Sequence, residues 1–118
     1  MYEYRAIVTK IYDGDTITVD IDLGFGAWLK KQSIRLYGID TPEIRGEERP
    51  EGLISKGILM KWVPVGSEIL LKTYKDSKGK YGRWLGEIFV PDEANAQLPY
   101  VNINEKLVQN GYAKRYEG

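Results

Sequence analysis

The sequence of 118 residues contains no cysteine and no histidine. Without cysteine, a disulfide framework, a thiolate metal site and a thiol nucleophile are excluded. Without histidine, imidazole acid–base chemistry and imidazole metal ligands are excluded as well. The groups left for chemistry are carboxylates, hydroxyls, carbonyls and the side chains of lysine and arginine. Any bound metal is therefore expected to be a hard cation, calcium or magnesium.

Long apolar runs and an excess of one charge sign are also absent. No run approaches the ~18 apolar residues of a membrane-spanning helix, so we expect no membrane partner. The first residues lack the basic and apolar regions of a secretory signal, which predicts a cytoplasmic protein, or a secreted one if the chain is a trimmed mature form. The 17 Lys and Arg residues balance 17 Asp and Glu residues, so a polyanion would need a local basic patch.

Apolar residues make up 42% of the chain and charged residues 29%, which suits one globular domain over residues 1–118. Strand patterns cover residues 4–11, 17–21, 33–39, 68–74 and 81–90. Helical spacing predicts a helix over 53–63, and a second helix is expected from a cap at Asn102 or Asn104 to Gly111. This order predicts a mainly β fold, a five-stranded barrel with helices packed on it.

Two connections are expected to be irregular. Residues 23–31 contain Gly24 and Gly26 and are expected to form a long hairpin connection. Residues 43–50 are charged, contain Gly46 and Pro50, and are expected to form a loop before the first helix.

Four segments carry the residues of chemical interest. They are Asp13-Gly14-Asp15-Thr16, Arg35 to Glu43, Lys80-Tyr81-Gly82-Arg83, and Asn104 to Ala113. Taken alone, the first is a simple turn and the end of the second is a strand exit or helix cap. Together, in this order and spacing, they resemble the staphylococcal nuclease (thermonuclease) family over nearly the whole chain. The resemblance implies an OB-fold barrel and calcium-dependent hydrolysis of DNA and RNA to 3′-phosphate products.

The resemblance implies that Asp15, Asp40 and the carbonyl oxygen of Thr41 bind Ca²⁺. The residues themselves favour the same chemistry, because two carboxylates at the ends of separate strands suit a hard cation completed by waters and a carbonyl. Asp13 would orient a metal-bound water. Capping of the turn is an equally good explanation of Asp13.

Arg35, Arg83 and Glu43 are the candidate catalytic residues. Guanidinium groups match phosphate oxygens in pairs and remain charged, so two of them beside a metal site suit a phosphodiester. The resemblance gives both arginines this role and makes Glu43 the general base that accepts a proton from water. The structural alternatives are an ion pair for Arg35, an exposed strand charge for Arg83 and a loop carboxylate for Glu43.

Residues 72–83 contain five basic side chains and one acidic side chain, a local patch suited to a nucleic-acid backbone. Lys80 and Tyr81 match family residues that contact a terminal phosphate. Tyr37, Tyr112 and Tyr116 are candidates for base stacking, and Tyr116 lies nearest the family's stacking tyrosine. The expected partners are DNA and RNA, with single strands or frayed duplex preferred, and the expected state is a monomer.

Two departures and two alternatives qualify this interpretation. Gly79 stands where the family usually has an acid, and the family's closing helix is absent or shifted, so altered substrate affinity is expected. A catalytically silent module that binds nucleic acid or protein is the main alternative, although the positions expected to decay in such a module are intact. A metal-free single-strand binder leaves Asp15, Asp40 and Glu43 unexplained.

Overall fold

The computed structural model describes residues 2–74, 83–92 and 100–116. Its elements in chain order are β1 (Tyr2–Asp13), β2 (Thr16–Gly24), β3 (Ala27–Leu36), β4 (Ile39–Asp40), the short 3₁₀ helix η1 (Gly46–Glu48), α1 (Arg49–Trp62), β5 (Glu68–Tyr74), β6 (Arg83–Pro91), β7 (Tyr100–Asn102), α2 (Ile103–Gln109) and β8 (Lys114–Arg115). No helix in these ranges is long and apolar enough to cross a membrane.

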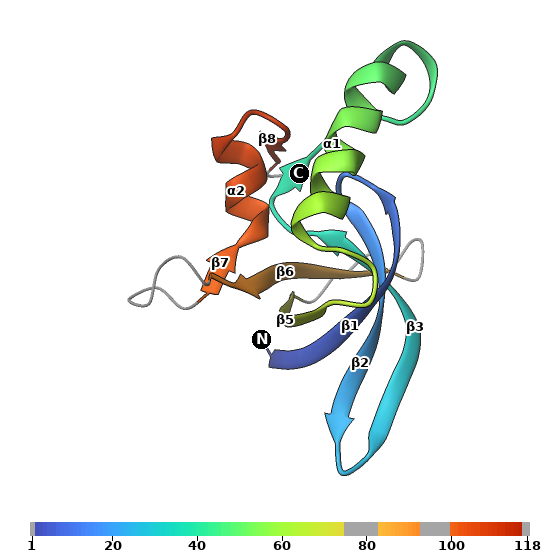
Figure 1. Cartoon of the computed structure of the whole chain (residues 1–118), viewed down its shortest axis with the longest axis vertical. Helices are drawn as coiled ribbons and strands as arrows, with labels where there is room; N and C mark the ends of the chain where they lie inside the picture. The colour runs from blue at the N-terminus through green and yellow to red at the C-terminus, as the bar shows by residue number, and fades with distance from the viewer. Residues whose placement is uncertain (1, 75–82, 93–99, 117–118) are drawn as a thin grey trace.

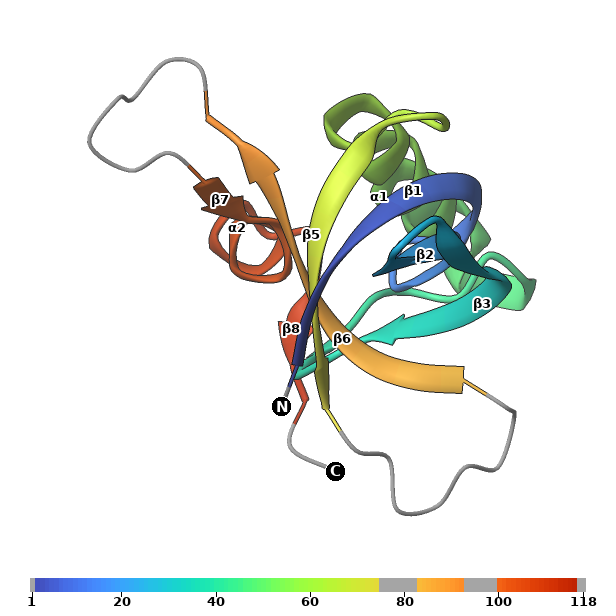
Figure 2. The same cartoon turned by 90° about the horizontal axis from the view of Figure 1, so that it is seen from below.

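The main sheet closes into a barrel. Strands β3, β2, β1, β5 and β6 are antiparallel neighbours in that order, and a parallel pairing of β3 with β6 joins the two ends. Figures 1 and 2 show the strands wrapping around a common axis, with α1 across one end and α2 beside β6 and β7. The prediction of a mainly β, five-stranded OB-fold barrel with packed helices is confirmed.

The core follows from the alternation of side chains along the strands. Ile17, Val19 and Ile21 of β2 are at most 4% exposed, as strict alternation predicts for a face turned to the interior. Leu59 of α1 and Leu107 of α2 are fully buried against the same cluster. Both helices therefore close the barrel with one apolar face each.

The expectation of a long connection over residues 23–31 was wrong. Strands β2 and β3 continue through this region as one long hairpin, in which Leu29 pairs with Ile21 and the chain reverses at Phe25 and Gly26. Gly24, Phe25 and Gly26 all have positive φ angles, so the glycines serve a tight turn. Figure 1 shows this hairpin projecting beyond the rest of the barrel.

The helix boundaries also differ from the expectation. Helix α1 begins at Arg49, with Pro50 in its first turn, where the missing N–H of proline costs no hydrogen bond. Asn102 is the residue that caps α2, since its side-chain oxygen accepts a hydrogen bond from the nitrogen of Glu105 at 3.2 Å. The short strands β7 and β8 were not predicted.

Candidate functional site

Asp15, Arg35 and Asp40 meet at one end of the barrel, although three different segments supply them. Arg35 Nη1 lies 3.2 Å from Asp15 Oδ2, and Arg35 Nη2 lies 3.2 Å from Asp40 Oδ1. One guanidinium therefore bridges the two carboxylates. Asp15 Oδ2 also accepts a hydrogen bond from the main-chain nitrogen of Thr41 at 3.0 Å, which brings the residue with the third predicted ligand atom next to the two carboxylates.

The backbone fixes this arrangement. Asp15 lies in the turn between β1 and β2, and its carbonyl oxygen accepts a hydrogen bond from Leu36 N at 2.7 Å. Thr16 pairs with Arg35 across β2 and β3, so the arginine is held beside the turn. Asp40 is held from the other side, because it pairs with Lys114 of β8. The Arg35 side chain is only 18% exposed, whereas that of Asp40 is 57% exposed.

Negative charge exceeds positive charge in this cluster. Burial, followed by the hydrogen bond and charge of Asp15, raises the pKa of Asp13 to about 6. Partial burial and the charge of Asp15 raise the pKa of Asp40, and the opposing effect of Arg35 does not cancel this. Both pKa shifts also contain repulsion from Asp15, which an added cation between the carboxylates would relieve. The site is therefore suited to additional positive charge.

The residues present fit a hard divalent cation. Two carboxylates and a main-chain carbonyl are oxygen donors of the kind that calcium and magnesium take. The hydroxyl oxygen of Thr41 is buried and has no hydrogen-bond partner in the described part of the chain. Within that part no three acidic side chains converge in a geometry that would hold a metal, so a cation here would rely on the carbonyl and on waters.

Asp13 has a clear structural role. Its Oδ1 accepts a hydrogen bond from Asp15 N at 3.0 Å, which closes the turn between β1 and β2. This contact supports the turn-capping explanation. Orientation of a metal-bound water by Asp13 stays a prediction.

Two glycines allow the close approach of segments around the site. A Cβ on Gly14 would lie 2.9 Å from both the hydroxyl of Thr41 and the Cβ of Ser55. A Cβ on Gly52 in α1 would lie 2.1 Å from the carbonyl oxygen of Glu43. Neither Gly52 nor Ser55 was identified from the sequence, because their importance comes from contacts with distant segments.

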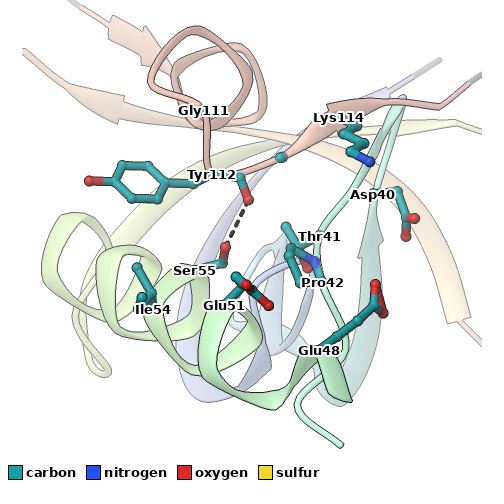
Figure 3. Close-up of a pocket in the computed structure, with 11 residues that line it drawn as sticks. Asp40, Thr41, Pro42, Glu48, Glu51, Ile54, Ser55, Gly111, Tyr112 and Lys114 are labelled. Carbon is teal, nitrogen blue, oxygen red and sulfur yellow. Dashed lines mark hydrogen bonds between the residues drawn. The ribbon is translucent and has the colours of Figure 1, made fainter. Parts of the chain in front are cut away.

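A pocket of about 320 Å³ opens beside Asp40 and Thr41. Figure 3 shows it between α1 and the segment that follows α2, with Asp40, Glu48 and Lys114 at one end. Ser55 Oγ donates a hydrogen bond to the carbonyl oxygen of Tyr112 at 2.8 Å and ties the two sides together (Figure 3). The main-chain segment that carries two of the candidate metal ligands is thus open to solvent on this side.

For the other candidate residues the structure describes only part of the surroundings or none. Glu43 is exposed, and its side chain lines an open groove of about 690 Å³ that also reaches Thr16 and Ser33. Arg83 begins β6 with its backbone paired to Ser33, and its side chain lies outside the described part of the structure. Lys80 and Tyr81 lie outside the described residues. The roles of all four stay predictions.

Among the three candidate tyrosines, Tyr116 lies at the site. Its ring centroid is 6.0 Å from Arg35 Cζ, and its main-chain nitrogen donates to the carbonyl of Gly38 at 2.8 Å. Tyr37 instead stacks on Tyr74 with ring centroids 4.1 Å apart.

Tyr112 packs away from the site. Its ring lies edge-on to Trp62 at 5.9 Å, against the core. Lys72, the first residue of the predicted basic patch, lies 3.6 Å from a carboxylate oxygen of Glu3 and is partly neutralised.

Comparison with known proteins identifies relatives of the whole barrel. The family model described as "Staphylococcal nuclease homologue" matches residues 33–118. The chain is 32% identical over 133 residues to "Uncharacterized protein MJ1439" of Methanocaldococcus jannaschii, 29% over 122 residues to "Endonuclease YhcR" of Bacillus subtilis, and 31% over 109 residues to "Thermonuclease" of Staphylococcus hyicus. These alignments cover 96%, 97% and 91% of the chain but only 59%, 9% and 56% of the relatives.

Proposed function

Because the chain belongs to the staphylococcal nuclease family, we propose that it is a nuclease that hydrolyses the phosphodiester bonds of DNA and RNA. The observation that carries this proposal is the bridge from Arg35 to both Asp15 and Asp40. In this proposal the guanidinium is the cation that binds phosphate, and the two carboxylates beside it are oxygen ligands for a divalent metal. Relatives named thermonuclease and endonuclease support the same class of activity.

Calcium is the proposed metal, and Asp15, Asp40 and the carbonyl of Thr41 would hold it. Calcium suits this set better than magnesium, because its looser and larger shell accommodates few protein ligands with several waters. When bound, a divalent cation neutralises the negative charge that develops on a phosphoryl oxygen.

Arg35 binds the phosphate in this proposal. Its terminal nitrogens contact Asp15, Asp40 and the carbonyl of Leu36, and a guanidinium has further N–H groups to offer. Arg83 provides a second guanidinium for the same group. Fixed positive charge of this kind stabilises the extra charge on the phosphate in the transition state.

Glu43 accepts a proton from the attacking water. The new bond forms between that water and phosphorus, and the bond from phosphorus to the 5′ oxygen breaks. The products are a 3′-phosphate and a 5′-hydroxyl, the latter protonated from water. The exposed position of Glu43 beside Thr16 in an open groove supports access to both water and substrate.

The test is cleavage of plasmid DNA and of single-stranded RNA with calcium and then with a chelator. We expect cleavage that the chelator stops. Arg35→Ala should reduce the rate by at least about 100-fold, as removal of one transition-state donor does. Glu43→Ala should reduce it by at least about 100-fold through loss of the general base. Lys61→Ala, at an exposed lysine of α1, is the charge control. Near-normal cleavage by either site variant would overturn the assigned roles, and gel retardation without cleavage would select a binding module.

A further inference from the structure

A polar groove crosses the outer surface of β1, β2 and β3 next to the site. Lys10 of β1 pairs with Thr18 of β2, and Thr18 pairs with Ser33 of β3. All three side chains line the groove of about 690 Å³. An ammonium group and two hydroxyls thus form one row across three strands. Lysine and hydroxyl side chains are the groups with which proteins contact phosphate and sugar.

The groove is continuous with the candidate site. Thr16 pairs with Arg35 two residues along the same strands, so Arg35 lies on the face that carries Ser33. Thr16 and Glu43 line the groove themselves. A polymer bound at Arg35 would therefore enter the groove directly.

The two cations of the groove form no ion pair within the described part of the chain. Lys10 makes no ion pair there, and Arg45 donates only to the hydroxyl of Tyr12, at 2.7 Å. By contrast, Lys30 farther along the hairpin is paired with Asp20 at 3.5 Å. Lys10 and Arg45 outnumber the single carboxylate of Glu43 in the groove lining, so the groove attracts an anion.

We propose that this groove binds the backbone of a single nucleic-acid strand that extends from the phosphate held at Arg35. The inference rests on the proposed nuclease function and assigns the path of its substrate. Lys10 and Arg45 contact phosphates, and Thr18 and Ser33 contact the backbone between them. Tyr12 is 40% exposed beside the two cations, and its ring offers a stacking surface to an unpaired base, which a duplex does not present.

The first experiment measures binding of a fluorescein-labelled single-stranded oligonucleotide by anisotropy, with chelator present so that no cleavage occurs. Lys10→Ala and Arg45→Ala should each weaken binding about five-fold at 0.1 M salt and lower the slope of log K against log salt by about 0.7, as expected for the loss of one phosphate contact. Lys10→Arg should restore both values. Lys61→Ala, which removes the same charge on α1, should leave both unchanged.

The second experiment compares two substrates with calcium present. For Lys10→Ala, the KM for the oligonucleotide should rise while kcat is kept, and the KM for a small aryl ester of a nucleotide should not change. Equal losses on both substrates would place Lys10 at the scissile phosphate and overturn the proposed binding path. Unchanged binding of the oligonucleotide by Lys10→Ala would overturn it as well. If the wild-type protein cleaves neither substrate, the proposed function fails, and the anisotropy measurement still decides whether the groove binds nucleic acid.

Discussion

A Cβ atom on Gly52 would lie 2.1 Å from the carbonyl oxygen of Glu43, closer than two nonbonded heavy atoms can approach. Helix α1 and the segment that follows β4 are therefore in contact at a position that only glycine permits. This contact fixes the position of the Glu43 main chain beside the site.

Gly52→Ala should destabilise the protein by about 1–3 kcal/mol, because the added methyl group must displace the Glu43 segment or the helix. Cleavage should fall more than the folded fraction does. The matched control is Gly57→Ala in the same helix, where the new Cβ meets open space. That variant should gain about 0.5–1 kcal/mol from the better helix propensity of alanine. Urea denaturation measures the free energy of unfolding of each variant, and a cleavage assay measures its activity. Equal changes in the two variants would contradict the contact.

The buried Asp13 predicts a pH dependence of stability in the metal-free protein. Its pKa is about 6 in the folded state against an ordinary value of 3.8, so the folded state binds the proton more tightly. The contribution of Asp13 to the free energy of unfolding is fully present below about pH 4 and is lost as the pH rises through about 6. Asp13→Asn keeps the oxygen that accepts from Asp15 N and has no charge to lose.

This variant should therefore be more stable than the wild type by about 1–2 kcal/mol at pH 8, after allowance for solvent screening, and no more stable at pH 3.5. Denaturation in chelator at the two pH values provides the measurement. A stability difference that grows as the pH falls would have the wrong sign and would contradict burial as the cause.

Calcium should raise the melting temperature if Asp15, Asp40 and Thr41 hold it. A ligand present at 100 times its dissociation constant contributes about 2.7 kcal/mol to the stability of the state that binds it. The wild-type protein should show this shift, and Asp40→Asn should lose most of it. Differential scanning calorimetry with calcium, magnesium and chelator tests the metal without reference to cleavage. A full shift in Asp40→Asn would remove Asp40 from the ligand set.

Asn104 is a buried polar residue whose hydrogen bonds link three segments. Its Oδ1 accepts from Ile88 N at 3.1 Å, and its Nδ2 donates to the carbonyls of Tyr37 at 2.9 Å and Gly86 at 3.1 Å. Asn104→Ala removes the side-chain partner of Ile88 N and of the Tyr37 carbonyl, whereas the Gly86 carbonyl keeps its bond from Tyr37 N, and should cost about 2–4 kcal/mol. Asn110→Ala, at an exposed asparagine that bonds only within α2, should cost less than about 1 kcal/mol. Similar losses in chemical denaturation would argue against the buried network.

The barrel was predictable because its strands carry a strong local signal. Ile17, Val19 and Ile21 alternate with polar residues, and this period alone places them inside. A hairpin between β2 and β3 was expected, but the continuation of its strands to the turn was missed because residues 27–31 lie beyond the core, where no buried face imposes alternation. Lys31 also has a positive φ angle of 56°, which interrupts the pattern.

The candidate site was only partly accessible to the same reasoning. Asp15, Arg35, Asp40 and Thr41 were singled out together, and the structure brings them within contact of one another. The supporting positions Gly52 and Ser55 were not predicted. Their roles depend on contacts with other segments, and those contacts exist only in the folded chain. A glycine that removes a clash has no local pattern that distinguishes it from Gly57 in the same helix.

The pairing of β4 with β8 makes Asp40 part of a ladder only two residues long. Its outer strand is fastened by Arg115, which forms a bidentate pair with Glu105 of α2 at 2.9 and 2.8 Å, and by the bond from Tyr116 to Gly38. These three attachments hold β8, and through it Asp40, a proposed ligand of the cation, against the barrel. Weakening these attachments, by a bulky fusion after β8 or by high salt that screens the Arg115–Glu105 pair, would release Asp40 while the barrel stayed closed.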